Sequence, residues 1–296
     1  MAAIMLSACK KDDTEELKAN ELRLLEQYLA DNNITVEPTA SGMYYIPIVE
    51  GTGISPGKGT YIEIHYVGEL IDGTVFTTSY EETAKTVGIK DGAFLYGPAR
   101  LQLGYIALDG LNEGIQLMKV GGKAKIIMPS DLGMGGYTSG SIPAYSTLIY
   151  TVELLEAFDD PEEFEQAKIW AYLEEGAFEN VDSTESGMYY IRESAGAGEP
   201  FVDGDAVKII YTGKFLDGRV FDSNVGGEVF SLTLPGTYII EGWKEGLNLM
   251  RNGEKGTLII PYKLGYGEEG RYDQYGRVVI PPFMTLVFEM ETELVE

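Results

Sequence analysis

One segment of this chain occurs twice, and this repetition limits what its 296 residues can fold into more than any other feature. The hexapeptide Ser-Gly-Met-Tyr-Tyr-Ile stands at residues 41–46 and again at 186–191. Further landmarks follow in the same order in both copies: Tyr66 and Tyr211, Gly68 and Gly213, Phe76 and Phe221, Gly110 and Gly242, Pro129 and Pro261, Ile142-Pro143 and Ile280-Pro281. Because such self-similarity marks repeated structural units, we expect two domains of the same fold.

The two copies differ in length in two intervals. The first copy is longer between Phe76 and Gly110, and the second is longer between Gly265 and Ile280. We expect both additions to lie in surface loops, where insertions are tolerated.

Each copy begins with an amphipathic helix pattern, at residues 15–31 and at residues 161–175. The second pattern has an acidic first turn, which suits a helix N-terminus. A further short helix is predicted to start at Gly242-Trp243 and to end at Gly253.

Strand patterns make up most of the second copy. The segments with strand periodicity are residues 207–212, 255–260 and 285–290. Asp217-Gly218 follows the first of them and is a two-residue hairpin signal. Many strands with one short helix predict an α+β domain in which an antiparallel sheet wraps around that helix.

Composition excludes several classes of function. A formal charge of −25 would repel nucleic acids, so they are not expected as partners. With one cysteine and one histidine, the chain lacks the ligands for zinc sites and for disulfides within the chain, and we expect no metal or other cofactor. His65 lies in an alternating pattern with Ile64 and Tyr66, which indicates an ordinary strand residue rather than a member of a Ser-His-Asp triad.

The second copy also carries a series of motifs in a specific order. They are VKIIYTG at 207–213, DGRVFDS at 217–223, IIEGW at 239–243, LGYG at 264–267, and IPP at 280–282 followed by TLVF at 285–288. Together they resemble the FKBP-type peptidyl-prolyl cis/trans isomerases, a likeness far more specific than any single motif.

The resemblance implies an apolar active-site bowl with Trp243 as its floor. The implied catalytic residues are Tyr211, Phe221, Asp222, Trp243, Tyr266 and Phe288. The implied substrate-binding residues are Phe230, Ile239, Ile240 and Ile280, joined by Tyr272 and Tyr275 unless their loop is only a solvated segment. Asp222 and Tyr266 would be the two polar groups at the rim of the bowl, which we call its polar handles. The Tyr266 phenol would donate a hydrogen bond to a carbonyl of the bound peptide.

An apolar bowl suits this reaction, because rotation about an X-Pro bond requires only that a barrier of about 18–20 kcal/mol from amide resonance be lowered. Taking the planar, charge-separated amide out of water favours the twisted transition state. Neither a nucleophile nor a metal is needed.

The first copy keeps the frame of the family and loses much of this site. The replacements are Thr77 for Asp222, Leu111 for Trp243, Met134 for Tyr266, Tyr150 for Phe288 and Ala99 for Phe230. We expect a weak or inactive isomerase there. It would bind unfolded segments, pair with another chain, or space the second domain from a membrane.

The N-terminal segment Leu6-Ser7-Ala8-Cys9 resembles a bacterial lipoprotein lipobox. The likeness implies lipidation of Cys9 and anchoring at the outer membrane of a Gram-negative-type cell envelope; the alternative is a chance thiol in a terminal tail. The apolar run at residues 2–6 is short for a signal core, so we expect that the recorded start omits upstream residues. Lys11-Asp12-Asp13 resembles a surface-export tag, which leaves the periplasmic and surface faces open.

The predicted organisation has five segments: residues 1–13 as signal remnant and tether, 14–32 as an N-terminal helix, 33–156 as a degenerate FKBP-like domain, 157–185 as a linker helix, and 186–296 as the isomerase domain. The predicted function is folding of secreted or envelope proteins through their proline-containing segments, with macrolides of the family as possible inhibitors. The alternative is a non-catalytic peptide-binding holdase or surface interaction lipoprotein. The oligomeric state stays open.

Overall fold

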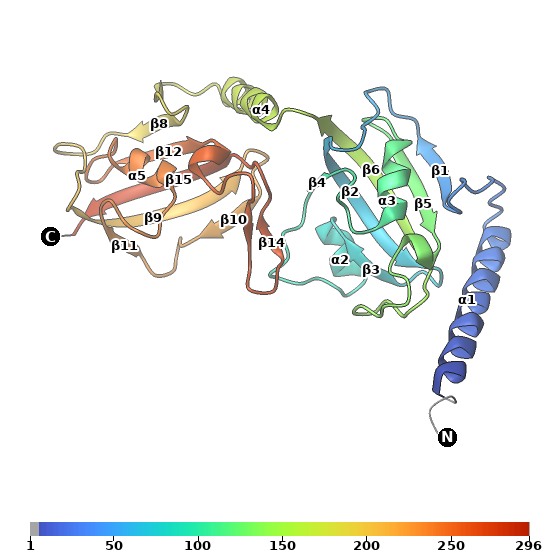
Figure 1. Ribbon diagram of the computed structural model, residues 1–296. Helices are drawn as coiled ribbons and strands as arrows, with labels where there is room; N and C mark the ends of the chain where they lie inside the picture. Colours follow the sequence, from blue (N-terminus) through green and yellow to red (C-terminus); the bar gives the residue numbers. More distant parts are fainter. Residues whose placement is uncertain (1–5, 296) are drawn as a thin grey trace. The chain divides into compact units, whose positions relative to one another are not determined.

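The computed structural model describes the backbone of residues 6–295 and the side chains of residues 14–295. These residues divide into two compact units, and the division falls between Asp159 and Asp160. Each unit combines helices with an antiparallel sheet (Figure 1). The predicted α+β class is therefore confirmed.

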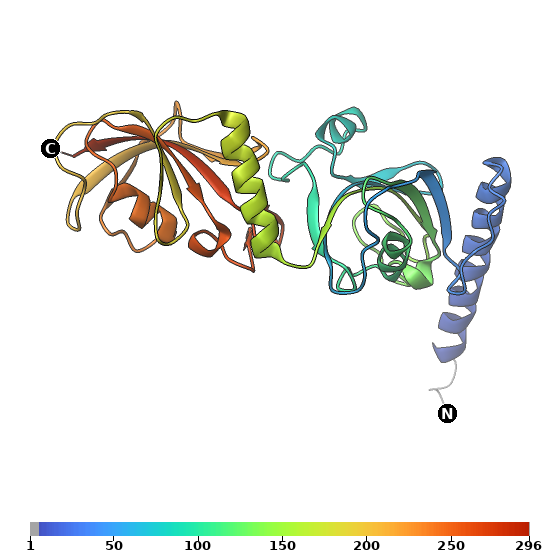
Figure 2. The same cartoon turned by 90° about the horizontal axis from the view of Figure 1, so that it is seen from above.

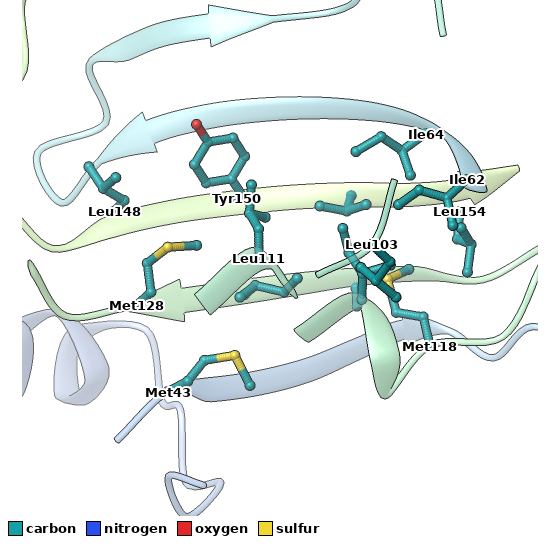
Figure 3. Close-up of a cluster of buried hydrophobic side chains, with 14 of the residues drawn as sticks. Met43, Ile62, Ile64, Leu103, Leu111, Met118, Met128, Leu148, Tyr150 and Leu154 are labelled. Atoms are coloured by element: carbon teal, nitrogen blue, oxygen red, sulfur yellow. The ribbon is translucent and has the colours of Figure 1, made fainter. Parts of the chain in front are cut away.

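The first unit contains one main sheet with a short helix on it. Its elements are α1 (Leu6–Asp31), β1 (Tyr44–Val49), β2 (Tyr61–Leu70), β3 (Val75–Thr78), α2 (Glu81–Thr86), β4 (Ala99–Gln102), α3 (Asp109–Gln116), β5 (Lys123–Met128), η1 (Ser130–Leu132) and β6 (Leu148–Phe158). The strand order is β1-β5-β6-β2-β3, and β4 also pairs with β2. Buried residues of α3 and of the sheet form one apolar core, part of which Figure 3 shows.

The second unit repeats this topology. Its elements are α4 (Pro161–Gly176), β7 (Val181–Ser183), β8 (Tyr189–Ser194), β9 (Ala206–Phe215), β10 (Val220–Ser223), β11 (Phe230–Thr233), α5 (Glu241–Leu247), β12 (Lys255–Ile260), η2 (Tyr262–Leu264), β13 (Arg271–Tyr272), β14 (Val278–Ile280) and β15 (Leu286–Leu294). The order β10-β9-β15-β12-β8 matches β3-β2-β6-β5-β1 strand for strand, while β13 and β14 form a separate hairpin.

Local predictions for the second unit agree with these elements except at one helix end. The predicted strand at 255–260 is β12, and Asp217-Gly218 makes the turn between β9 and β10. The prediction that the short helix ends at Gly253 is wrong, because α5 ends at Leu247 and single turns follow it, such as the one closed by Met250 N–H on the Leu247 carbonyl (3.1 Å).

Helix α4 packs against the sheet of its own unit (Figure 2). It begins after Asp160, whose carboxylate accepts from the backbone N–H groups of Glu162 (2.9 Å) and Glu163 (3.0 Å). Its Ile169 is buried in a cluster with Ile191, Ile259 and Val287. The segment that sequence analysis treats as a linker helix is thus also part of the second unit's packing.

Helix α1 begins at Leu6, before the predicted start at residue 15, because its pattern extends into the segment interpreted as a tether. Leu25 packs with Ile127 and Ile149 of the first unit's sheet. Between residues 6 and 295, no helix is both long and apolar enough to cross a lipid bilayer.

A buried glutamate fastens each of these helices to its sheet. Glu21 of α1 accepts from Ser130 N (2.6 Å), Ser130 Oγ (2.6 Å) and Thr147 Oγ1 (3.0 Å). Glu165 of α4 accepts from Thr285 N (2.9 Å). Thr147 and Thr285 both stand directly before corresponding strands, β6 and β15. In both units the helix glutamate thus contacts the threonine before the corresponding strand, through the Thr147 hydroxyl in the first and through the Thr285 backbone N–H in the second.

Candidate active site

Five aromatic rings from five elements meet on the inner face of the second unit's sheet; we call this group the aromatic bowl. Its members are Tyr211 of β9, Phe221 of β10, Phe230 of β11, Trp243 of α5 and Phe288 of β15. The Trp243 ring lies 5.0 Å from Tyr211, 5.1 Å from Phe288 and 5.8 Å from Phe230, centroid to centroid. These contacts are edge-to-face, an arrangement that aromatic pairs prefer.

The bowl has a buried floor and an accessible rim. Trp243 is 5% exposed, whereas Phe230 is 38% exposed. The indole Nε1 of Trp243 is buried and has no hydrogen-bond partner in the described part of the chain. Buried polar groups usually have a partner, so the floor carries a donor that the surrounding side chains leave unused.

Gly213 of β9 allows two of these rings to approach each other. Both Asp222 and Phe288 lie opposite Gly213 in the sheet register. A Cβ atom at this position would lie 2.7 Å from Phe221 and 2.8 Å from Phe288, which is shorter than real carbon contacts. The absence of a side chain therefore determines how tightly this wall of the bowl is packed.

A polar pair lies at the rim. The Tyr211 hydroxyl donates to Asp222 Oδ2 over 2.8 Å. Burial, helped by this hydrogen bond, raises the pKa of Tyr211 to about 12, so the phenol keeps its proton at neutral pH. Tyr266 lies close enough to contribute to the same rise. Of the two predicted polar handles, Asp222 is thus in direct contact with Tyr211.

Comparison with known proteins agrees with this geometry. The family model of the FKBP-type peptidyl-prolyl cis-trans isomerases matches residues 53–155 and 198–293, more than half of the chain. The chain belongs to this family. An Escherichia coli relative, the FKBP-type 22 kDa peptidyl-prolyl cis-trans isomerase, is 37% identical over 191 residues, covering 62% of this chain and 89% of the relative. The enzyme class predicted from the motifs is therefore confirmed.

Other relatives are matched over smaller parts of their length. FkpA of Aeromonas hydrophila, an FKBP-type isomerase, is 37% identical over 49% of this chain and 48% of its own. Human FKBP9 is 29% identical over 79% of this chain and 34% of its own. Among solved structures, FkpA from Escherichia coli shares 37% identity, with a TM-score of 0.37, over 46% of this chain and 60% of its own.

The remaining site residues predicted from the FKBP resemblance differ in accessibility. Ile239 and Ile240 are half-buried just before α5. Ile280 is 1% exposed, so a substrate would reach little of its side chain. Tyr272 and Tyr275 are 50% and 74% exposed on the β13–β14 hairpin. Their contact with a substrate stays a prediction, as does every role assigned here to a single residue.

Cys9 stands in the first turns of α1, among residues 6–13. The side chains of these residues lie outside the described part of the structure. Lipidation of Cys9 therefore stays a prediction.

The corresponding site of the first unit has the same backbone register as the aromatic bowl but different side chains. Thr77 lies opposite Gly68 as Asp222 lies opposite Gly213. Tyr150 likewise lies opposite Gly68, in the place that Phe288 has in the second unit.

Core residues form the floor of this first site. Leu111 stands where the other unit has Trp243, and it is 5% exposed. Tyr150 is 7% exposed and belongs to the same core cluster as Leu111 (Figure 3).

Sequence analysis missed the residues that the lengthened interval of the first unit brings to this site. Phe94 and Tyr96 pack with ring centroids 4.8 Å apart. They line a cavity of about 110 Å³ together with Phe76 and Thr77. Two aromatic residues so close together in a supposed surface loop were the available signal.

Proposed function

We propose that the second unit carries the isomerase activity of this chain, with the aromatic bowl as its active site. The single observation that supports this most is the convergence of Trp243, Phe288 and the Tyr211–Asp222 pair on one face. The reaction breaks no covalent bond; it needs only a site that binds the twisted amide better than the planar one.

Each group then has a distinct task. The rings remove water from the prolyl amide, which weakens the resonance that holds it planar. The Tyr266 phenol donates to a carbonyl of the bound peptide. Asp222 accepts from Tyr211 and so holds that ring against Trp243, whose centroid is 5.0 Å away.

The first unit, in this proposal, contributes little turnover and serves to bind unfolded segments. Thr77 cannot replace the carboxylate of Asp222, and Leu111 offers no indole. The cavity beside Phe76 measures about 110 Å³, below the roughly 300 Å³ or more that is usual for small-molecule sites.

A double substitution, Asp222→Ala with Tyr266→Phe, tests the assignment in the full chain. We expect the prolyl isomerisation rate, measured by NMR exchange on a blocked peptide, to fall by roughly 100-fold, since one positioned donor alone contributes about 10²–10³ in other enzymes. Thr77→Ala, at the position of the first unit that matches Asp222, is the control and is expected to keep the rate. Equal losses in both variants would show that the activity is misassigned. Inhibition by a macrolide of the family, lost in the double variant only, is a second expected result.

A second candidate function is peptide binding without turnover. The exposed rim residues Phe230 (38%), Tyr272 (50%) and Tyr275 (74%) favour it, since accessible aromatic side chains supply contact area. Peptide titration with no rate enhancement in the unsubstituted chain would establish this alternative.

We also propose that the chain is a lipid-anchored folding catalyst of the cell envelope, on the basis of the lipobox-like segment that ends at Cys9. Metabolic labelling with an alkyne fatty acid in a bacterial host tests the anchor. We expect labelling that Cys9→Ser abolishes. Label that persists in the variant contradicts the proposal.

A further inference from the structure

One cationic side chain lies beside the polar handles of the bowl. Arg271 is the first residue of β13, within the interval that is longer in the second copy. Its guanidinium carbon lies 5.7 Å from the centroid of the Tyr266 ring. Its charge is also felt at Tyr211, where it opposes the rise in pKa. Arg271 therefore lies beside Tyr266, which the proposed active site assigns to contact with the substrate.

The backbone fixes this position. Gly270 N–H donates to the Tyr266 carbonyl (3.1 Å), and Arg271 pairs with Ile280 across the hairpin. Gly270 has a φ of +70°, and a Cβ atom there would lie 2.3 Å from the Ile280 carbonyl oxygen, so only glycine fits. The turn that leads into Arg271 is thus held against Tyr266.

The tip of the hairpin is ordered independently. Arg277 Nε donates to Asp273 Oδ2 over 2.6 Å. The other carboxylate oxygen of Asp273 accepts from the backbone N–H groups of Tyr275 (2.8 Å) and Arg277 (2.9 Å). Arg271 takes no part in these contacts, so its side chain can be changed without loss of the turn.

Arg271 is also unusual in its charge environment. Most cationic side chains of this unit are paired with carboxylates, as in Lys214–Glu289 (2.5 Å) and Lys244–Glu241 (2.5 Å). Within residues 14–295, Arg271 has no carboxylate at salt-bridge distance, although the chain carries a net charge of −25. The guanidinium group of Arg271 is therefore available to bind a negatively charged group of a ligand.

We propose that Arg271 selects substrates that carry an acidic side chain next to the proline, an inference that rests on the proposed active site. A guanidinium group can bind a carboxylate through two parallel hydrogen bonds. Because Arg271 is exposed, the gain is modest, about fivefold in kcat/KM for a glutamate over a glutamine peptide. A lysine at the same place is disfavoured by charge repulsion.

The test uses the full chain and blocked peptides Ac-Ala-Xaa-Pro-Phe-NH2, with Xaa as Glu, Gln or Lys, so that the ends carry no charge. We expect the Glu-to-Gln ratio of kcat/KM to fall by about fivefold in Arg271→Gln and to be kept largely in Arg271→Lys. Lys255→Gln, which removes the same charge at the far end of β12, serves as the control and is expected to keep the ratio.

A Glu-to-Gln ratio that is the same in Arg271→Gln and in the unsubstituted chain overturns the inference, while normal turnover of the Gln peptide leaves the active-site assignment intact. A uniform drop for all three peptides overturns it as well, because Arg271 would then act on every substrate. If no peptide is turned over, the active-site assignment fails, and dissociation constants for the same peptides still decide the selectivity.

Discussion

The substitution Gly213→Ala should disturb the active site, because the added methyl group would clash with two rings of the aromatic bowl. The new Cβ atom would lie 2.7 Å from Cε2 and Cζ of Phe221 and 2.8 Å from Cε1 of Phe288. Carbon atoms attract best at about 3.5–4.0 Å, so each ring has to withdraw by roughly 0.8 Å. Phe288 is 4% exposed and packs against Trp243, so it cannot move alone.

Two effects of Gly213→Ala follow from this displacement. Overpacking of a filled core costs about 1–3 kcal/mol, which lowers the free energy of unfolding by that amount. Displacing binding groups by about 1 Å can cost about 100-fold in rate, so we expect kcat/KM to fall by about tenfold to 100-fold. The assay is NMR exchange of a prolyl peptide with the full chain, beside denaturant unfolding.

Gly68→Ala in the first unit is the matched control. Its Cβ atom would lie 2.8 Å from Thr77 and 2.9 Å from Phe76, so the packing penalty should be similar. Because the proposed active site lies in the other unit, the rate should stay within about twofold of the unsubstituted chain. If Gly213→Ala keeps its full rate, or if Gly68→Ala loses as much, the reasoning about the bowl is refuted.

Three further outcomes are expected. Trp243→Leu, which places at this position the residue that the first unit has at Leu111, should lower kcat/KM by at least about tenfold while the protein stays folded, as judged by a cooperative denaturant unfolding curve, and near-normal turnover would contradict the role of the floor. The folded pKa of Tyr211 is about 12 against 10.0 unfolded, so the stability it contributes is complete below pH 10 and is lost as pH rises toward 12; urea midpoints should fall more steeply there than in Tyr211→Phe, and parallel curves would argue against it. Glu165→Ala leaves Thr285 N–H without that acceptor, which should cost about 1–3 kcal/mol and speed exchange of this amide, whereas Glu165→Gln should be milder; equal exchange in both would speak against the attachment.

The members of the bowl could be predicted from the FKBP resemblance, and all of them except Trp243 lie on strands. The alternation of side chains along a strand places Tyr211 on the inner face of β9. Thr77 and Asp222 occupy the same position in the two copies, each opposite a glycine of the neighbouring strand. The resemblance to the FKBP family implied which residues form the bowl, and regular strands, which fix register and side-chain direction, explain why the rings on strands lie together.

Loop and helix-docking features could not be predicted in this way. The closeness of Phe94 and Tyr96 in the chain marks them as candidates but does not show that they line a cavity, because a loop's path depends on packing by distant residues. Glu21 and Glu165 look like solvated helix residues, since burial of a carboxylate depends on partners more than 100 positions away in the chain. The lack of a carboxylate beside Arg271 is likewise visible only in three dimensions.

The attachment of α4 bears on how the second unit can be produced by itself. A truncated gene product that starts at Ser186 would lack Glu165 and leave the amide of Thr285 without its acceptor. It would also expose to water the apolar surface beneath the missing helix, formed by Ile191, Ile259 and Val287. Expression should therefore begin ahead of Asp160, and poor solubility of a shorter fragment would reflect where it was cut rather than a flaw in the sheet.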